Sequence, residues 1–324
     1  MRSWFLIFLT FATTALAQIS LPEGSHPVEV EAKFYLLSLN SMNEKAETFD
    51  ADIYLEFSWT DKRLAHSENQ ELTFNEQAAT DKLKEIWWPQ LEFVNTSHPE
   101  ITNISLTIQP DGKAVLDYGL SATFRSSFDL KRFPFDEQTL NVRVQSFFYQ
   151  SQDVVFKANP GEASFHDSEN SDGFQVADVN AKVVLQEANA WIKSYSEYRA
   201  GIRLHRDSAF YIWTVFGPVI LIFIICCTIH LMPYDNLADR VGTCLTTLLA
   251  CIATQFTLSF TLPQISYLTL VDRLFIVTYA FTALNVCIAA LESFTGTPPM
   301  RKRLLLFLGI PFIYIVVVIV ALYI

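Results

Sequence analysis

The chain has 324 residues, of which 51% are hydrophobic, and its mean hydropathy of +0.24 is too high for an ordinary soluble protein. Its formal net charge of −11 argues against a nucleic-acid partner. The apolar residues are concentrated after residue 206, so we expect two domains with a boundary there.

Met1–Ala17 has the organisation of a signal peptide. Arg2 gives a positive start, Trp4–Ala12 an apolar stretch, and Ala15–Ala17 a small-residue cleavage site. The alternative is a short first membrane helix, but the stretch is short and polar residues follow it at once. We therefore expect residues 18–206 to form a domain in the periplasm or outside the cell.

Residues 28–204 alternate apolar and polar side chains in short runs, which is typical of half-buried strands. Turn signals such as Pro110-Asp111-Gly112 and Pro160-Gly161 separate the runs, and a short helix is predicted near Asn75–Ile86. The pattern predicts an antiparallel, immunoglobulin-like β-sandwich. The clearest runs are Val28–Leu39, Ala51–Trp59, Ile101–Ile108, Thr139–Phe147 and Ala181–Leu185.

All five cysteines lie in the apolar part, so no disulfide can hold the exported domain together. They lack the paired spacing of a zinc site, and we interpret them as small buried hydrophobic side chains. The chain also shows no nucleophile elbow, P-loop or Gly-rich phosphate loop. We therefore predict no metal, no cofactor and no enzymatic activity. The cysteines are Cys226, Cys227, Cys244, Cys251 and Cys287.

Four apolar segments after residue 206 are long enough to cross a hydrocarbon core, which needs about 20 residues. With the first domain outside, four crossings return the C-terminus to the outside. The linker Ser293–Arg303 is basic, which favours the cytoplasmic side, and Pro263–Arg273 then faces the exported domain. Residues 207–324 are thus predicted to be an all-α four-helix domain in the lipid bilayer. The segments are Phe210–Leu231, Val241–Leu262, Leu274–Leu291 and Leu304–Ile324.

The second apolar segment is rich in hydroxyl side chains. Six of its residues fall on one helical stripe, which is small and polar at the cytoplasmic end and bulky and apolar above it. A ring of such helices would form a polar section and a hydrophobic constriction that closes by dewetting. The alternative is a buried helix whose hydroxyls bond to their own backbone. The stripe consists of Gly242, Thr246, Leu249, Ala253, Phe256 and Phe260.

Asp239 and Arg240 stand at the cytoplasmic start of the same segment. Repeated around a ring, Asp239 would present several carboxylates to passing ions, and carboxylate rings favour cations. Arg240 must then point away from the ring axis, or it would cancel that charge.

Several motifs, taken in order, resemble one family. Phe133–Gln138 is similar to the loop that names the Cys-loop receptor superfamily of pentameric ligand-gated ion channels. Ser126 and Leu140 stand where that loop has its two cysteines, as in bacterial members, which also lack them. Trp59-Thr60-Asp61 resembles the family's Trp-x-Asp strand, and Trp88-Pro89 resembles its first ligand loop.

Within the family, Glu44–Phe49 and Asp61–Ala65 are most similar to the proton-gated bacterial members. The Pro–Ala pair that anion-selective members insert before the second helix is missing. Two features of the proton-gated members are also missing, because their pore-helix histidine falls on Cys251 and their acidic mouth residue on Ala238. The stimulus therefore stays open between a small cationic ligand and protons. Histidines that could sense pH are His98, His166 and His205.

The resemblance implies a homopentamer around the second helices, with ligand bound between neighbouring sandwiches. It also implies a coupling zone where the sandwich meets the membrane helices. Arg206 would lie buried between two carboxylates there, or each residue would belong only to a weak surface ion pair. The coupling residues implied are Glu44, Asp136, Arg206, Pro263 and Tyr267.

Aromatic side chains in the family's ligand loops enclose a cationic ligand through cation–π contacts. Trp88 could serve there or belong to the core. The last three aromatics of the set fall in what reads as a polar hairpin before the final strand, where a binding role is favoured. The residues implied are Trp88, Phe147, Phe148, Tyr149, Trp191, Tyr195 and Tyr198.

Two functions follow from these expectations. The first is a subunit of a cation-selective channel in the inner membrane that passes monovalent cations. The second is a membrane-anchored sensor that binds a small molecule without conducting. A transporter or membrane enzyme is disfavoured, because the spans lack Asp, Glu, Lys and Arg away from their ends.

Overall fold

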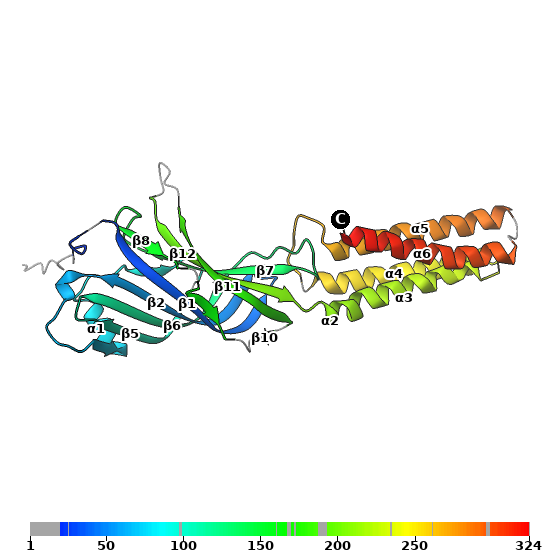
Figure 1. The fold of residues 1–324 in the computed structure, drawn as a ribbon. Coiled ribbons are helices and arrows are strands. Elements are labelled where there is room, and N and C mark those ends of the chain that lie inside the picture. Colours follow the sequence, from blue (N-terminus) through cyan, green and yellow to red (C-terminus); the bar gives the residue numbers. More distant parts are fainter. Residues whose placement is uncertain are drawn as a thin grey trace, which may run out of the picture.

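The structure, a computed structural model, describes residues 20–24, 26–96, 99–159, 161–166, 170–171, 173–186, 193–233, 235–260, 262–295 and 299–323. A β domain and a bundle of long helices follow one another along the chain and along the long axis of the molecule (Figure 1). The predicted signal peptide, His98, Pro160 and the predicted ligand residue Trp191 lie outside the described residues.

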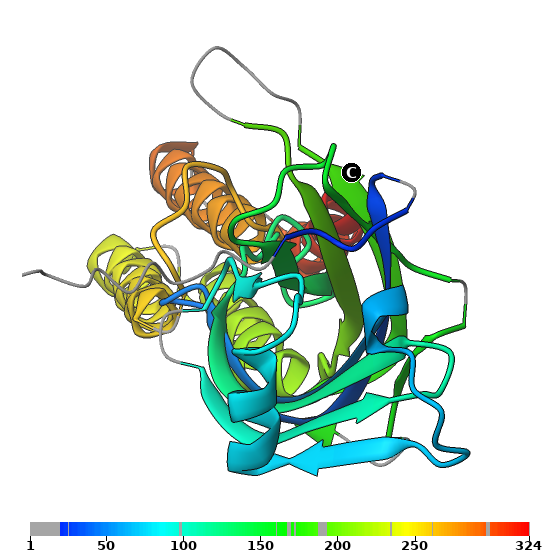
Figure 2. The ribbon, with the colours of Figure 1, turned by 90° about the vertical axis from the view of Figure 1, so that its left-hand side faces the viewer.

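Two sheets make up the β domain, as a sandwich (Figure 2). One has seven strands in the order β3-β5-β6-β2-β1-β8, with β9 also paired to β1, and the other has the order β10-β11-β12-β7-β4. The strands of the first sheet are β1 (Val28–Asn43), β2 (Thr48–Thr60), β3 (Leu72–Asn75), β5 (Glu100–Ile108), β6 (Lys113–Arg125), β8 (Val154–Lys157) and β9 (Ala163–Phe165). Those of the second are β4 (Leu91–Phe93), β7 (Glu137–Ser146), β10 (Asn170–Ser171), β11 (Phe174–Leu185) and β12 (Ser196–Arg206).

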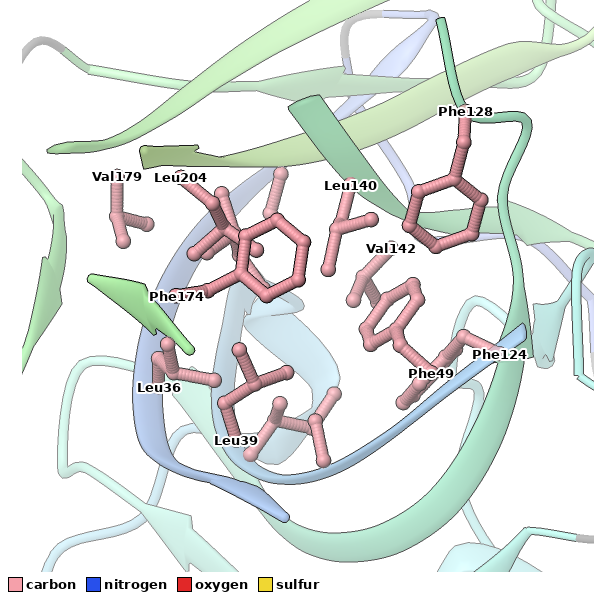
Figure 3. Close-up of a cluster of buried hydrophobic side chains, with 14 of the residues drawn as sticks. Leu36, Leu39, Phe49, Phe124, Phe128, Leu140, Val142, Phe174, Val179 and Leu204 are labelled. Atoms are coloured by element: carbon pink, nitrogen blue, oxygen red, sulfur yellow. The ribbon is translucent and has the colours of Figure 1, made fainter. Parts of the chain in front are cut away.

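The sandwich core follows from the two-residue period of the strands. Side chains of β2 alternate between buried and half-buried along most of its length, because successive Cβ atoms point to opposite faces of a sheet. Phe49 of β2 stacks on Phe124 of β6 with ring centroids 5.2 Å apart, in the cluster that also takes in Leu140 and Leu204 of the other sheet (Figure 3). Each such side chain contributes about 1.5–3 kcal/mol when buried.

The predicted sandwich is present, and the predicted helix near Asn75–Ile86 is α1 (Glu76–Leu83). The pairing is not wholly antiparallel, however. β8 and β9 each run parallel to β1, with Val28 opposite Val154 and Phe34 opposite Ala163. Alternation along a strand shows which face is buried but says nothing of a partner's direction, so the sequence pattern could not show this.

The turn at Pro110-Asp111-Gly112 is also where the pattern placed it. Gly112 has a φ of +87°, which glycine adopts without strain. A Cβ at this position would meet the carbonyl oxygen of Asp61 at 2.6 Å. That oxygen lies so close because Asp61 donates its backbone N–H to the carbonyl of Gly112 at 3.0 Å, which ties the turn to the end of β2.

Four stretches of helix in the second part are long and apolar enough to cross a membrane. The first combines α2 (Ala209–Tyr211), a π-helical turn η2 (Ile212–Phe216), α3 (Gly217–Cys227) and the 3₁₀ turn η3 (Thr228–His230). The π turn ends two residues before Pro218, which has no N–H to continue the ordinary α-helical ladder. The others are α4 (Leu237–Ser259), α5 (Leu270–Thr295) and α6 (Met300–Tyr323).

The four predicted segments coincide with these helices, and the observed helices begin one to four residues earlier. The end of α6 lies at the sandwich end of the bundle (Figure 1), as an even number of crossings requires. One expectation was wrong. Cys287 is exposed on the side of α5, whereas the other four cysteines are buried as expected.

Candidate functional site

The structure brings Glu44, Asp136 and Arg206 together at the end of the sandwich that adjoins the helices. Arg206 is the last residue of β12, and its side chain is only 2% exposed. Its Nε and Nη2 donate to the two carboxylate oxygens of Asp136 at 2.7 and 3.0 Å, a bidentate geometry, and its Nη1 donates to Glu44 at 2.6 Å. The contact is therefore a buried cluster and not a surface ion pair.

Aromatic rings enclose the same guanidinium. Its central carbon lies 4.3 Å from the ring centroid of Phe174, 4.8 Å from that of Phe133 and 5.7 Å from that of Tyr211. Burial alone would lower the pKa of Arg206, but the hydrogen bond and charge of Asp136, with the charge of Glu44, outweigh it and raise that pKa. The arginine is therefore held charged at the junction between β12 and α2.

The linker between α4 and α5 also meets the sandwich here. The hydroxyl of Tyr267 accepts the backbone N–H of Leu130 at 3.1 Å, and the Lys131 ammonium lies 5.6 Å from the Tyr267 ring centroid. Leu270, the first residue of α5, donates its N–H to the carbonyl of Lys131 at 3.1 Å. Pro263 is half-buried in the same linker. The loop before β7 is thus bonded both to the end of β12 and to the linker before α5.

Helix α4 has one buried side and one uncovered side. The buried residues Arg240, Cys244, Thr247 and Cys251 face the rest of the bundle, whereas all of the predicted stripe is exposed. Figure 2 shows α4, in yellow, at the outer edge of the bundle. The stripe lies about 160° around the helix from the buried side, at 100° per residue. The exposed residues are Asp239, Gly242, Thr246, Leu249, Ala253, Phe256 and Phe260.

The bulky end of this stripe is strongly exposed. Leu249, Phe256 and Phe260 are 67, 63 and 60% exposed, and the rings of Phe256 and Phe260 meet edge to face at 4.7 Å. At the other end of the helix Asp239 is exposed while its neighbour Arg240 is fully buried. The two adjacent charges therefore point to different surroundings, as a cation-selective mouth would require.

The hydroxyls of α4 are bonded to their own helix, as the alternative reading of this segment expected. Thr246 donates to the carbonyl of Gly242 at 2.9 Å, and Thr254 and Thr257 make the same bond one turn back. That alternative also expected the helix to be buried, which it is not. It therefore explains the hydroxyl bonds but not the exposure of α4. Because each hydroxyl proton is used in the helix, Thr246 has only its oxygen lone pairs to present on the exposed stripe.

Four of the predicted ligand residues lie around two adjoining pockets at the far end of the sandwich. A pocket of about 980 Å³ is lined by Trp88, Phe148 and Tyr149, and one of about 380 Å³ by Phe147 and Phe148. Trp88 is half-buried and packs on the core as well as lining the pocket, and its role in binding stays a prediction. The segments are tied together, since Phe147 donates its N–H to the carbonyl of Gln90 at 2.8 Å.

The reading of the last three ligand aromatics as a polar hairpin was wrong for Tyr198. It lies inside β12 and is 0% exposed, and burial raises its pKa. Ser196 and Glu197 are buried beside it, which hides the usual alternation in the sequence. Tyr195 does precede β12 and is half-buried, but it lines neither pocket.

Sequence reasoning missed two residues of this region. Trp87 is the buried tryptophan of the Trp87-Trp88 pair, packed edge to face against Trp59 at 6.1 Å. Glu92 lines the smaller pocket beside Phe147 and Phe148, and its carboxylate accepts a hydrogen bond from Gln145 at 3.1 Å. The signal for Glu92 in the sequence was a carboxylate between two apolar residues in Leu91–Phe93, a pattern typical of a short strand.

Comparison with known proteins agrees with this arrangement. Residues 15–208 match the profile of the neurotransmitter-gated ion-channel ligand binding domain. Gamma-aminobutyric acid receptor subunit beta-4 of Gallus gallus is 26% identical over 288 residues, which are 86% of this chain and 58% of that protein. Gamma-aminobutyric acid receptor subunit rho-3 of Homo sapiens is 25% identical over 291 residues, 86% of this chain and 61% of that protein.

The chain spans about three fifths of the length of these curated relatives. The profile covers the whole described sandwich and ends where the first membrane helix begins. Because it matches more than half of the chain, the family is established: this chain belongs to the neurotransmitter-gated ion channels.

Proposed function

We propose that the chain is one subunit of a homopentameric, cation-selective ligand-gated channel whose pore is lined by α4. Its family consists of ion channels, so the chain is not an enzyme. The observation that carries the proposal is the exposed stripe of α4, opposite a side that is packed and buried. One subunit cannot cover that stripe. A ring of copies would turn it inward around a water-filled axis.

Selectivity for cations is supported by the chemistry of the stripe. Asp239 offers a carboxylate, Arg240 is withdrawn into the bundle, and Thr246 offers oxygen lone pairs. Every one of these features favours a positive ion over a negative one. The relatives are named as receptors for gamma-aminobutyric acid, so selectivity is a property to be measured on this chain itself.

The gate is proposed at Leu249, Phe256 and Phe260. In a pentamer, each would form an apolar ring on the axis. A narrow apolar ring favours the loss of its water and stops conduction without a physical plug.

Coupling is proposed to run through the Arg206 cluster. Arg206 joins the end of β12 to Asp136 in the loop before β7 and to Glu44 between β1 and β2. The same loop is bonded to Tyr267, and Tyr267 and Pro263 both lie in the linker that follows the pore helix α4. A ligand that binds one state of the sandwich more tightly would then bias the pore through these contacts.

The ligand site is proposed at the pockets lined by Trp88, Phe147, Phe148 and Tyr149, completed by a neighbouring subunit. Glu92 adds a carboxylate to the aromatic walls, which suits a small cation such as an organic ammonium. Tyr195, which precedes β12, stays proposed as a ligand-binding residue, and so does Trp191, which lies outside the described residues. Protons are the alternative stimulus.

We place the protein in a bacterial inner membrane, near the proton-gated bacterial members of the family. Residues 1–17 would be the signal peptide, 18–206 the periplasmic sensor and 207–324 the channel domain. The exposed basic residues Arg301 and Lys302 at the far end of the bundle support a cytoplasmic position for that end.

Electrical recording from cells that express the chain tests the proposal, with pH and small amines varied and sodium chloride unequal across the membrane. The proposal expects a stimulated current that reverses near the sodium equilibrium potential, and a particle of five subunits in mild detergent. Reversal near the chloride potential would overturn cation selectivity. A complete lack of current from correctly inserted pentamers would favour the non-conducting sensor.

A further inference from the structure

A second buried ion pair lies at the opposite end of the membrane domain from Arg206. The side chain of Arg240 in α4 is fully buried, and its Nη2 donates to Glu292 near the end of α5. Its Nε also donates to the carbonyl of Ile229 at 3.0 Å, and its Nη1 to that of Ala289 at 3.4 Å. The guanidinium therefore bridges the ends of three membrane helices.

Glu292 is the single carboxylate that meets Arg240 among the residues that the structure describes. Arg240 also bonds to two backbone carbonyls, but these carry no net charge to balance the guanidinium. The second carboxylate oxygen of Glu292 has no hydrogen-bond partner there, nor does Nδ1 of the buried His230, 4.0 Å from Glu292. The other ring nitrogen of His230 is engaged with Asn285 at 3.0 Å. The charge of Arg240 thus depends on one carboxylate from another helix.

The consequence for the pore follows from the helical period. Asp239 and Arg240 are neighbours, so their side chains leave the helix about 100° apart. With Arg240 fixed against α5, Asp239 is directed to the exposed stripe. Were Arg240 released, its long side chain would seek water, as arginines do at membrane surfaces. In the proposed pentamer, the pore mouth beside Asp239 would offer that water.

We propose that Glu292 is a positioning residue for ion selection, which rests on the proposed channel function. It holds Arg240 in the bundle, so that the ring of Asp239 carboxylates acts on passing ions without a neighbouring ring of positive charge. Glu292 itself lies away from the stripe and touches no permeating ion. Its effect on selectivity passes entirely through Arg240.

Two variants separate this role from a merely structural one. In Glu292→Gln, the unpaired Arg240 moves toward the mouth, and we expect the chloride-to-sodium permeability ratio to rise several-fold and conductance to fall. In the double variant Arg240→Gln with Glu292→Gln, no positive charge is left to move. Cation preference should therefore return although two residues are changed. Lys302→Gln removes an exposed charge at the same end of the bundle and should leave selectivity as it is.

The outcomes are distinct. If Glu292→Gln keeps the wild-type permeability ratio, or if the double variant is no more cation-selective than the single one, the proposal is wrong while the channel function stands. If the wild-type chain passes no current, the channel function fails by itself. Whether Glu292 holds Arg240 in the bundle is then tested by the melting temperature in detergent. The proposal requires Glu292→Gln to melt at a lower temperature than the double variant.

Discussion

Replacing Arg206 by alanine is the most demanding test of the coupling cluster. The substitution removes three charge-assisted hydrogen bonds and leaves Asp136, which is 2% exposed, beside Glu44, which is 16% exposed. Removing one partner of a buried ion pair costs about 3–5 kcal/mol, because the other charge stays buried and uncompensated. Glu44 keeps some contact with water, so we expect about 3–4 kcal/mol.

A loss of that size lowers the melting temperature by roughly 6–16 °C, at about 2–4 °C per kcal/mol for a domain of this length. We expect Arg206→Ala to assemble at reduced temperature and to bind ligand, but to give no stimulated current. Arg206→Lys keeps the charge but not the bidentate fork, so its behaviour should be intermediate. Arg203→Ala, an exposed arginine on the same strand, is the matched control.

The assay combines recording with thermal unfolding of the purified protein, measured for all three variants. The reasoning is refuted if Arg206→Ala melts within about 2 °C of wild type, below the loss derived from one broken buried pair. It is equally refuted if that variant opens with an unchanged stimulus threshold. Destabilisation with normal gating would leave the cluster as an element of the sandwich fold and remove its coupling role.

Three further predictions concern the pore and the sandwich. Leu249→Ser should wet the apolar ring and raise the current at rest, whereas Leu248→Ser, about 100° away on the helix, should only impair packing. If both variants behave alike, the side of α4 assigned to the pore is wrong. Asp239→Ala should shift the reversal potential toward chloride or lower conductance, and an unchanged channel would remove Asp239 from selectivity. Glu197 is fully buried between Arg143 and another arginine; burial raises its pKa, but the arginine hydrogen bonds outweigh this, so the pKa is lowered overall. The stabilisation from ionised Glu197 is present above its unfolded pKa of about 4.3 and is lost as pH falls through its lower pKa in the folded protein. The difference in melting temperature between wild type and Glu197→Gln should therefore narrow in acid, and a constant difference would contradict this prediction.

The parts of the fold that could be predicted are those written in local patterns. The four helices were recognisable because a run of about 20 apolar residues is typical of a membrane-spanning helix and of few other structures. Their ends were less clear, since the first turn of α5 contains the polar residues Asp272 and Arg273, which a search for apolar residues leaves out. The stripe of α4 was visible for the same local reason, because side chains three and four apart share a face.

The features that were missed depend on contacts between distant residues. Arg240 and Glu292 are 52 positions apart, and nothing near either one indicates its partner. Glu197 is buried because two arginines bond to its carboxylate. In the sequence it looks like a surface residue, so its neighbour Tyr198 was assigned to a polar hairpin instead of to β12. The Arg206 cluster was expected only through the resemblance to a family, since Glu44 and Arg206 are 162 positions apart.

The parallel pairing of β1 with β8 and β9 has a consequence for synthesis and export. β1 can form a hairpin with β2 as soon as both have crossed the membrane, but its other edge waits for residues 154–165. During that interval a long strand with one apolar face presents unpaired N–H and C=O groups, which is the surface on which chains join edge to edge. A chain truncated between β7 and β8 should therefore aggregate, whereas one that continues through β9 closes this edge with its own residues.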